Sequence, residues 1–293
     1  LYDIMVRRAE LAGSAGGARA ASAELPFRME AGRLAMRLGR ADEAASAFER
    51  SLAIEAQGAS AVEAQTALET LYETAERWAD LADLLGRRID AEGEGADTLD
   101  IHVRLARILS ERLSNRERAI AHLAWVLRVA PDRDDAIGLL EGFLDEPDSI
   151  GAAADLLDPV YVRQGNWAKL VALDERRRSF IESPERRTMW TRRIARIYEE
   201  QVEDLDKAFE WYAKVFEESP TDGDAQDQLL RLAPKLGRWK ELAGILGDYL
   251  DQELSDDPPV LEVVRLAAVI SDEHVGDRDH ARKYYRRLMD AQP

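Results

Sequence analysis

The chain contains no cysteine, only four histidines and no long apolar run. The lack of cysteine excludes disulfides, thiolate-bound zinc and a thiol nucleophile, but leaves the redox compartment open. No stretch approaches the roughly 20 apolar residues that a membrane-spanning helix needs, and the start does not resemble a signal peptide. We therefore expect no membrane insertion. The sequence is compatible with the periplasm and with the cytoplasm, which we favour.

Positive charge is also scarce. There are 40 Lys and Arg residues against 57 Asp and Glu, which gives a formal net charge of −17. Nonspecific binding of nucleic acid requires cationic side chains that displace phosphate counterions. Nucleic acid and anionic membranes are therefore poor candidate partners, and basic or apolar protein surfaces fit better.

Long β-branched runs are missing as well, whereas Ala, Leu, Glu and Arg, which favour helices, are abundant. Hydrophobic residues make up 46% of the chain and charged residues 33%, which favours a folded chain over a disordered one. The composition predicts an all-α protein. The excess of Arg over Lys is typical of a high-GC bacterial source.

One pattern occurs four times in the sequence. It begins at an alanine, has a ring or Leu four residues later, and in three copies ends at a proline twelve residues after the alanine. The residues are Ala44 and Phe48; Ala119, Leu123 and Pro131; Ala208, Tyr212 and Pro220; and Ala281, Tyr285 and Pro293.

A second pattern places Leu and another aliphatic residue at steps of three after Trp78, Trp167 and Trp239. A third is the triplet Arg-Leu/Ile-Ala that begins at Arg33, Arg104, Arg193 and Arg265. Repetition at a near-constant period indicates a solenoid of stacked units, in which the ring positions belong to the core.

The spacing of Ala, ring and Pro resembles the tetratricopeptide repeat in a divergent, bacterial-type array. The best matches are Asp206–Tyr212 through Pro220, Arg116–Ile120 through Pro131, and Asp42–Ala45 with Phe48. The resemblance implies a right-handed superhelical solenoid of antiparallel helix hairpins whose concave face binds extended peptides or partner helices. The Lys and Asn clamp of the family's peptide binders has no residue-by-residue match here.

The repeats divide the chain into units of one continuous solenoid. We expect the end of a preceding unit at 1–12, unit 1 at 23–92, unit 2 at 97–182 with an inserted helix near 148–164, unit 3 at 186–253, and the first hairpin of unit 4 at 259–293. Because Leu1–Arg8 align with Leu81–Arg88, and Pro293 with the end of a hairpin, we interpret the chain as a segment of a longer array. Gly13–Ser22 is expected to be a weakly structured link, and Asp132 and Thr221 are expected to cap helices.

A cluster of arginines stands out against the acidic background. Eight arginines lie between Arg176 and Arg196, with Trp190 among them. Arginine forks bind carboxylates, and arginine with aromatic residues is favoured at interface hot spots. Arg107 and Arg196 also share one place in their units. The candidate partner-binding residues are Arg107, Arg176, Arg177, Trp190, Arg192, Arg193 and Arg196. The alternative is that these arginines pair with acidic faces of adjacent helices.

No catalytic constellation is apparent. His274 and His280 are six residues apart, which is not the spacing of two metal ligands on one helix face, and we interpret this stretch as a loop with a helix cap. Gly13–Gly17 lacks the Lys-Ser/Thr of a phosphate-binding loop. No cofactor and no metal site is expected. The sequence favours a non-catalytic scaffold for protein–protein interaction. The alternatives are a regulatory or substrate-recruiting domain of a larger enzyme, and a structural protein that associates end to end.

Overall fold

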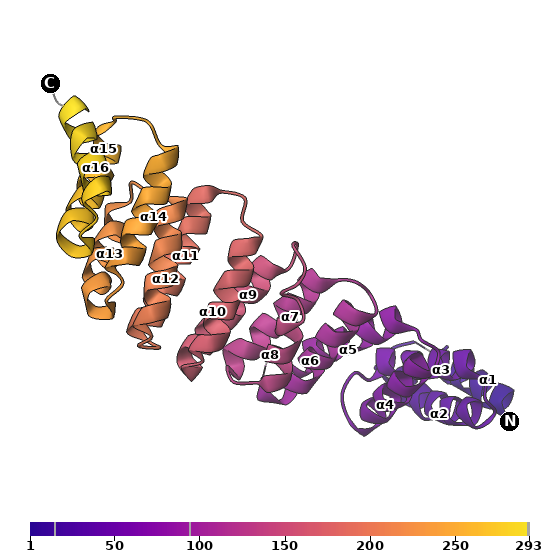
Figure 1. Ribbon diagram of the computed structural model, residues 1–293. Helices are drawn as coiled ribbons and strands as arrows, with labels where there is room; N and C mark the ends of the chain where they lie inside the picture. Colours follow the sequence, from indigo (N-terminus) through magenta and orange to yellow (C-terminus); the bar gives the residue numbers. More distant parts are fainter. Residues whose placement is uncertain (15, 94, 292–293) are drawn as a thin grey trace. The chain divides into compact units, whose positions relative to one another are not determined.

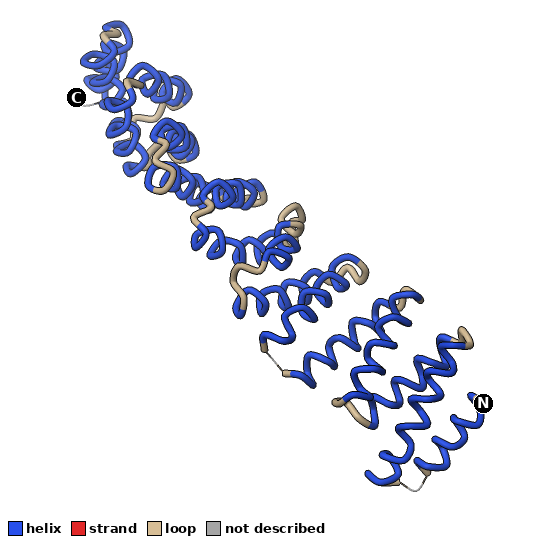
Figure 2. The backbone as a smooth tube through the Cα atoms, turned by 90° about the horizontal axis from the view of Figure 1, so that it is seen from below, coloured by secondary structure: helices blue, strands red, loops and turns tan. Residues whose placement is uncertain are grey.

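The computed structural model describes residues 1–14, 16–93 and 95–291, which fold into sixteen α-helices and two short helical segments without a strand (Figure 1; Figure 2). The predicted all-α class is thereby confirmed. The chain divides into two compact units, residues 1–143 and 144–293. In each unit successive helices pack against one another as antiparallel hairpins joined by short loops, which gives the predicted helical repeat. Within these ranges, no helix combines the length and the apolar character needed to cross a membrane.

The first compact unit contains eight α-helices among its described residues. They are α1 (Tyr2–Gly13), α2 (Ala18–Arg37), α3 (Ala41–Ile54), α4 (Ala59–Thr74), α5 (Trp78–Glu92), α6 (Leu99–Glu111), α7 (Arg116–Val129) and α8 (Asp134–Glu141), with the 3-10 turn η1 (Ala96–Thr98) before α6. Because α2 begins at Ala18, the prediction that all of Gly13–Ser22 is a link was wrong. Residues 18–22 continue the helical period upstream, and Ala20 is buried.

The second compact unit contains α9 (Ile150–Gln164), α10 (Trp167–Ser179), α11 (Pro184–Glu200), α12 (Leu205–Glu218), α13 (Gly223–Leu236), α14 (Trp239–Gln252), α15 (Pro258–Val269) and α16 (Arg278–Ala291). A π-helical segment, η2 (Ile270–Val275), follows α15. The helix expected near 148–164 is α9, which keeps Pro159 inside it. It pairs with α10 as α4 pairs with α5 and α13 with α14.

The small residues of the repeat are buried in their hairpins. Ala44, Ala119 and Ala208 are completely buried, and the ring or Leu positions Phe48, Leu123 and Tyr212 are buried beside them. The fourth copy differs, because Tyr285 is partly exposed although Ala281 is buried. Pro131 and Pro220 follow the ends of α7 and α12, as predicted from the missing N–H of proline. Pro293 lies outside the described residues.

The three repeated tryptophans do not lie in the core, contrary to expectation. Trp78, Trp167 and Trp239 are the first residues of α5, α10 and α14, and each is half-buried. The Trp78 ring is contacted by a charged group, since the guanidinium of Arg112 lies 4.7 Å from its centroid. The aliphatic residues three positions later, such as Leu81 and Leu242, occupy the core instead.

The turn inside the Ala-led hairpins is the same in three copies. Ser114, Glu203 and Gly276 have positive φ angles of 52°, 59° and 79°. The next residue donates its N–H to the carbonyl six positions back, at 2.7 to 2.9 Å. That residue is Asn115, Asp204 or Asp277, and its side chain accepts a hydrogen bond from the N–H three positions later, as an N-cap does.

The residues expected to cap α8 and α13 are one position too early. Helix α13 follows Asp222, whose carboxylate accepts from the N–H of Ala225 at 3.1 Å, and not Thr221. Helix α8 follows Arg133, and not Asp132. In both cases one further residue is needed to turn the chain after the proline before the helical period starts.

Candidate functional site

The predicted arginine cluster lies on α10 and α11 in the second compact unit, and carboxylates surround it. Arg177, which is almost completely buried, donates to Asp155 at 2.8 Å. Its guanidinium also lies 4.7 Å from the centre of the Trp190 ring, and that of Arg193 lies 5.3 Å from the same centre. Arg176 pairs with Asp145 at 2.8 Å. Trp190 therefore contacts two cations that are already paired with acids of their own chain.

Asp174 is the most deeply buried charge of this cluster, with no exposed surface. Its Oδ1 accepts from Arg193 at 3.1 Å, but Arg193 is shared with Asp158 at 2.5 Å. Its Oδ2 has no hydrogen-bond partner in the described part of the chain. Burial raises the pKa of Asp174 to about 7, against the attraction of Arg193, and the nearby charge of Asp158 raises it further.

The other arginines of the cluster connect α10 and α11 to later helices. Arg192 forms an ion pair with Asp222, the N-cap of α13. Arg178 forms one with Glu218 at the end of α12, and also donates to Thr191 at 2.8 Å. Five of the seven candidate residues thus contact other parts of their own unit, largely as the alternative interpretation anticipated. Arg177, Arg193 and Trp190 contact other helices, whereas Arg192 contacts the N-cap of α13 and Arg176 contacts the turn before α9. Whether they also contact a partner stays a prediction.

Arg107 and Arg196 behave differently from the rest of the candidates. They lie at the same repeat position, on the first helices α6 and α11, and both are exposed. Neither forms an ion pair with any residue within 1–14, 16–93 or 95–291. Met36 occupies the corresponding position on α2 and is also partly exposed.

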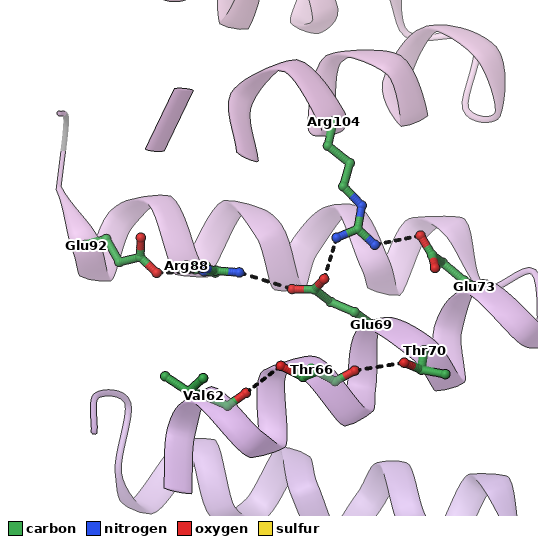
Figure 3. A network of polar contacts seen from close by, with 8 residues as sticks. All are labelled: Val62, Thr66, Glu69, Thr70, Glu73, Arg88, Glu92 and Arg104. Carbon is green, nitrogen blue, oxygen red and sulfur yellow. Dashed lines mark hydrogen bonds and ion pairs between the residues drawn. The ribbon is translucent and has the colours of Figure 1, made fainter. Parts of the chain in front are cut away.

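The arginine of the repeated triplet has a role that the sequence reasoning did not assign. Figure 3 shows Arg104 on α6 between Glu69 and Glu73 of α4, with the contact to Glu73 at 2.6 Å. Glu69 is also paired with Arg88 of α5 at 3.3 Å, so one carboxylate joins three helices. Arg33 similarly makes a bidentate contact with Glu63 of α4, at 2.6 and 2.7 Å. The sequence contained a signal for this role, because arginine recurs at the first position of all four triplets.

The fourth triplet lacks this bridge. Among the described residues, the one ion-pair partner of Arg265 on α15 is Glu262 of its own helix, at 3.2 Å. The triplet arginine is therefore a link between hairpins where an acid faces it, and a surface residue where none does.

The histidines form two kinds of contact. His102 and His122 bring their Nδ1 atoms to 3.0 Å, and His102 stacks on Trp125 at 4.1 Å between ring centroids. Burial, helped by the charge of Arg118, lowers the pKa of His122. His274 stacks on Trp239, and His280 bonds to Asp277 at 2.8 Å. Asp277 caps α16 as predicted, but the loop predicted around His274 was wrong, because Ile270–Val275 form the helical segment η2 with Ile270 and Ser271 buried. The described residues include no group of three or more His, Asp or Glu side chains that could hold a metal ion.

The comparisons with known proteins give distant likenesses only. No protein family and no curated protein matches the chain. A tetratricopeptide repeat protein from Parabacteroides merdae ATCC 43184 is 12% identical, covers 92% of this chain and 93% of its own, and has a TM-score of 0.31. A thermophilic tetratricopeptide repeat protein from Thermus thermophilus is 20% identical, with coverages of 70% and 96% and a TM-score of 0.25. The TPR2AB domain of yeast Sti1, solved in a pHSP90 complex, is 11% identical, with coverages of 93% and 100% and a TM-score of 0.31. The hairpins described above, and not these likenesses, are the basis on which we describe the repeat as tetratricopeptide-like.

Proposed function

We propose that the chain is a non-catalytic scaffold that binds a peptide or a partner protein through the surface of its helical repeat. The observation that carries the proposal is the pair Arg107 and Arg196. In a chain with a net charge of −17, these two arginines occupy equivalent positions, are exposed and form no ion pair among the residues described. A free guanidinium fork binds a carboxylate through two parallel hydrogen bonds.

The partner that fits these positions carries acidic side chains toward the first helices. Met189, one of the exposed large apolar residues, lies two turns before Arg196 on α11 and adds an apolar contact on that helix face. The paired residues of the cluster support this surface by fixing α11 against its neighbours. They would contact the partner only by exchanging their present carboxylates for those of the partner.

The test is capture of a partner by the chain and by a charge-reversed variant. The Arg107→Glu/Arg196→Glu variant should lose a partner that the wild-type chain captures from the source lysate, as identified by mass spectrometry. The Arg7→Glu/Arg19→Glu variant changes the charge equally at two exposed residues of α1 and α2 and serves as the control. Equal capture by the two variants, both with wild-type circular dichroism, would show that neither Arg107 nor Arg196 contacts the partner.

Self-association is a second candidate, favoured by the outer face of α16. Tyr285 and Met289 are 37% and 68% exposed, whereas the equivalent residues of α12, Tyr212 and Phe216, are 3% and 0% exposed. A second copy that covers this face would bury two large apolar side chains. Light scattering should then give a mass that rises with concentration for the wild type but not for Tyr285→Glu/Met289→Glu. A constant monomer mass for both proteins would refute self-association through this face.

A further inference from the structure

Helix α14 has a hollow between itself and α12 that combines aromatic and acidic groups. Its volume is about 310 Å³. Phe216 and Tyr249 both line it and their rings meet edge to face, with centroids 5.8 Å apart, and Ile245 adds to the apolar lining. Glu217 and Asp248 are exposed and also line it, and we call this pair the acidic rim. The hollow is therefore lined by both apolar and acidic side chains.

The two rim carboxylates are not neutralised by their own chain. Glu217 and Asp248 are both exposed, and neither forms a salt bridge with a residue in the described ranges. Many other carboxylates of this chain are paired with arginine, as at Glu63, Glu69 and Asp158. Two unpaired anions beside an aromatic ring form a site for a cation, since a ring face attracts a guanidinium or ammonium group.

A second hollow of about 330 Å³ lies on the other flank of α14, against η2 and α16. Asp248 lines both hollows, and Asp251 and Asp277 line the second. Glycine allows a close approach on this flank, because a Cβ on Gly247 would lie 3.2 Å from the hydroxyl of Tyr284. The charges here are partly compensated, since Asp251 is bonded to Lys283 at 2.7 Å and Lys240 also lines the hollow.

The first compact unit has a hollow at the same repeat positions, with a different character. It lies beside α5 and measures about 200 Å³. Ala53 and Arg87 take the places of Glu217 and Asp248, and Arg88 takes the place of Tyr249. The hollow is thus a property of the repeat, whereas its acidic rim and its ring are particular to α12 and α14.

We propose that the hollow between α12 and α14 binds an arginine side chain from a basic segment of a partner protein, with the guanidinium stacked on Tyr249 and paired with Glu217 and Asp248. The second hollow accepts the neighbouring residue of the same segment. This site rests on the proposed scaffold function and adds a basic partner segment to it. Arginine fits better than lysine because its planar group can stack on the ring and contact both carboxylates at once.

The experiment measures binding of fluorescein-labelled hexa-arginine to the full chain by anisotropy in 50 mM NaCl, with hexaglutamate as the negative probe. The Glu217→Gln/Asp248→Asn variant should bind hexa-arginine at least tenfold more weakly than the wild type. The control variant Glu10→Gln/Glu117→Gln removes the same charge from two exposed residues of the first compact unit and should change the affinity less than twofold. Tyr249→Leu keeps the carboxylates and should weaken binding about threefold to tenfold.

The outcomes separate this site from a general attraction to the acidic chain. Equal weakening in the site and control variants would overturn the proposal, as would the absence of hexa-arginine binding to the folded wild type. Circular dichroism of each variant shows whether it is folded, and Tyr249→Leu provides a second test that leaves the charge unchanged. Hexa-arginine binding is independent of the partner captured from the lysate. If hexa-arginine does not bind, the capture test of Arg107 and Arg196 is unaffected. If the capture test fails, the hexa-arginine measurement stays valid.

Discussion

Asp174 shows how a single buried residue can set the pH dependence of this protein. Its carboxylate has no exposed surface and shares the cation that donates to it, Arg193, with Asp158. Its pKa is raised to about 7, mainly by burial. Since an aspartate in an unfolded chain has a pKa of about 4, the folded state binds more protons than the unfolded state between about pH 4 and 7. The contribution of Asp174 to stability is therefore present at low pH and lost as the pH rises through this window.

The isosteric substitution Asp174→Asn tests this prediction. The variant cannot ionise, so its melting temperature should depend less on pH than that of the wild type. We expect the free energy of unfolding of the wild type, relative to that of the variant, to fall by on the order of 3 kcal/mol between pH 5 and pH 8. The magnitude follows because each tenfold change in proton affinity is worth about 1.4 kcal/mol. If the melting temperatures of the two proteins changed in parallel with pH across this range, Asp174 would be ionised throughout and its cations would compensate its burial.

The sequence allowed the location of this residue cluster to be predicted, but not its partners. Eight arginines within 21 residues are visible in the sequence, and so is Trp190. The acids that bind them come from other helices, such as Asp158 on α9 and Glu218 on α12. Which side chains meet across helices depends on the rotation of each helix, and the repeat pattern fixes that rotation only within one hairpin. Among the candidates, Arg107 and Arg196 are the two that form no ion pair within the described residues, and their contact with a partner stays a prediction.

At the scale of elements, the hairpin turns carry strain that glycine would relieve. Ser114 and Glu203 occupy the left-handed region, where a residue with a Cβ costs about 1–2 kcal/mol, and Gly276 occupies the same position in the last hairpin. Ser114→Gly and Glu203→Gly should therefore each stabilise the protein by about 1 kcal/mol, less the added entropy of glycine in the unfolded chain. Gly276→Ala should destabilise it by a similar amount. Urea unfolding of the three variants measures these differences, and a loss of stability in Ser114→Gly would contradict the explanation.

These turns also mark the limit of prediction at this scale. The Ala-led helices, their closing prolines and the additional helix α9 were all indicated by the spacing of apolar residues. The caps Asp222 and Arg133 were missed because a proline fixes where the preceding helix ends and not how many residues the turn needs. The half-buried tryptophans were placed in the core because hydrophobicity alone does not distinguish the first turn of a helix from its middle.

For the whole molecule, the repeat could be predicted because the same residue spacings recur several times in the chain. The division into two compact units could not be predicted. The boundary after Phe143 follows α8, the short helix that opens the irregular part of the second repeat. The expected unit 97–182 contains this boundary. Its extra residues were visible in the spacing of 89 between Ala119 and Ala208, but spacing does not say to which neighbours an additional helix packs.

Net charge is the property of the whole molecule with the clearest consequence for stability. With 57 acidic against 40 basic residues, distant carboxylates repel one another in the folded state. Raising NaCl from 10 to 150 mM shortens the Debye length from about 30 to about 8 Å, which screens this repulsion. Close contacts such as Arg104 with Glu73, at 2.6 Å, are screened less. The melting temperature measured by circular dichroism should therefore rise by a few degrees over this range. Sucrose at equal osmolality serves as the control for the exclusion of solutes from the protein surface. A steady fall with salt would mean that the arginine–carboxylate links between helices outweigh the net repulsion.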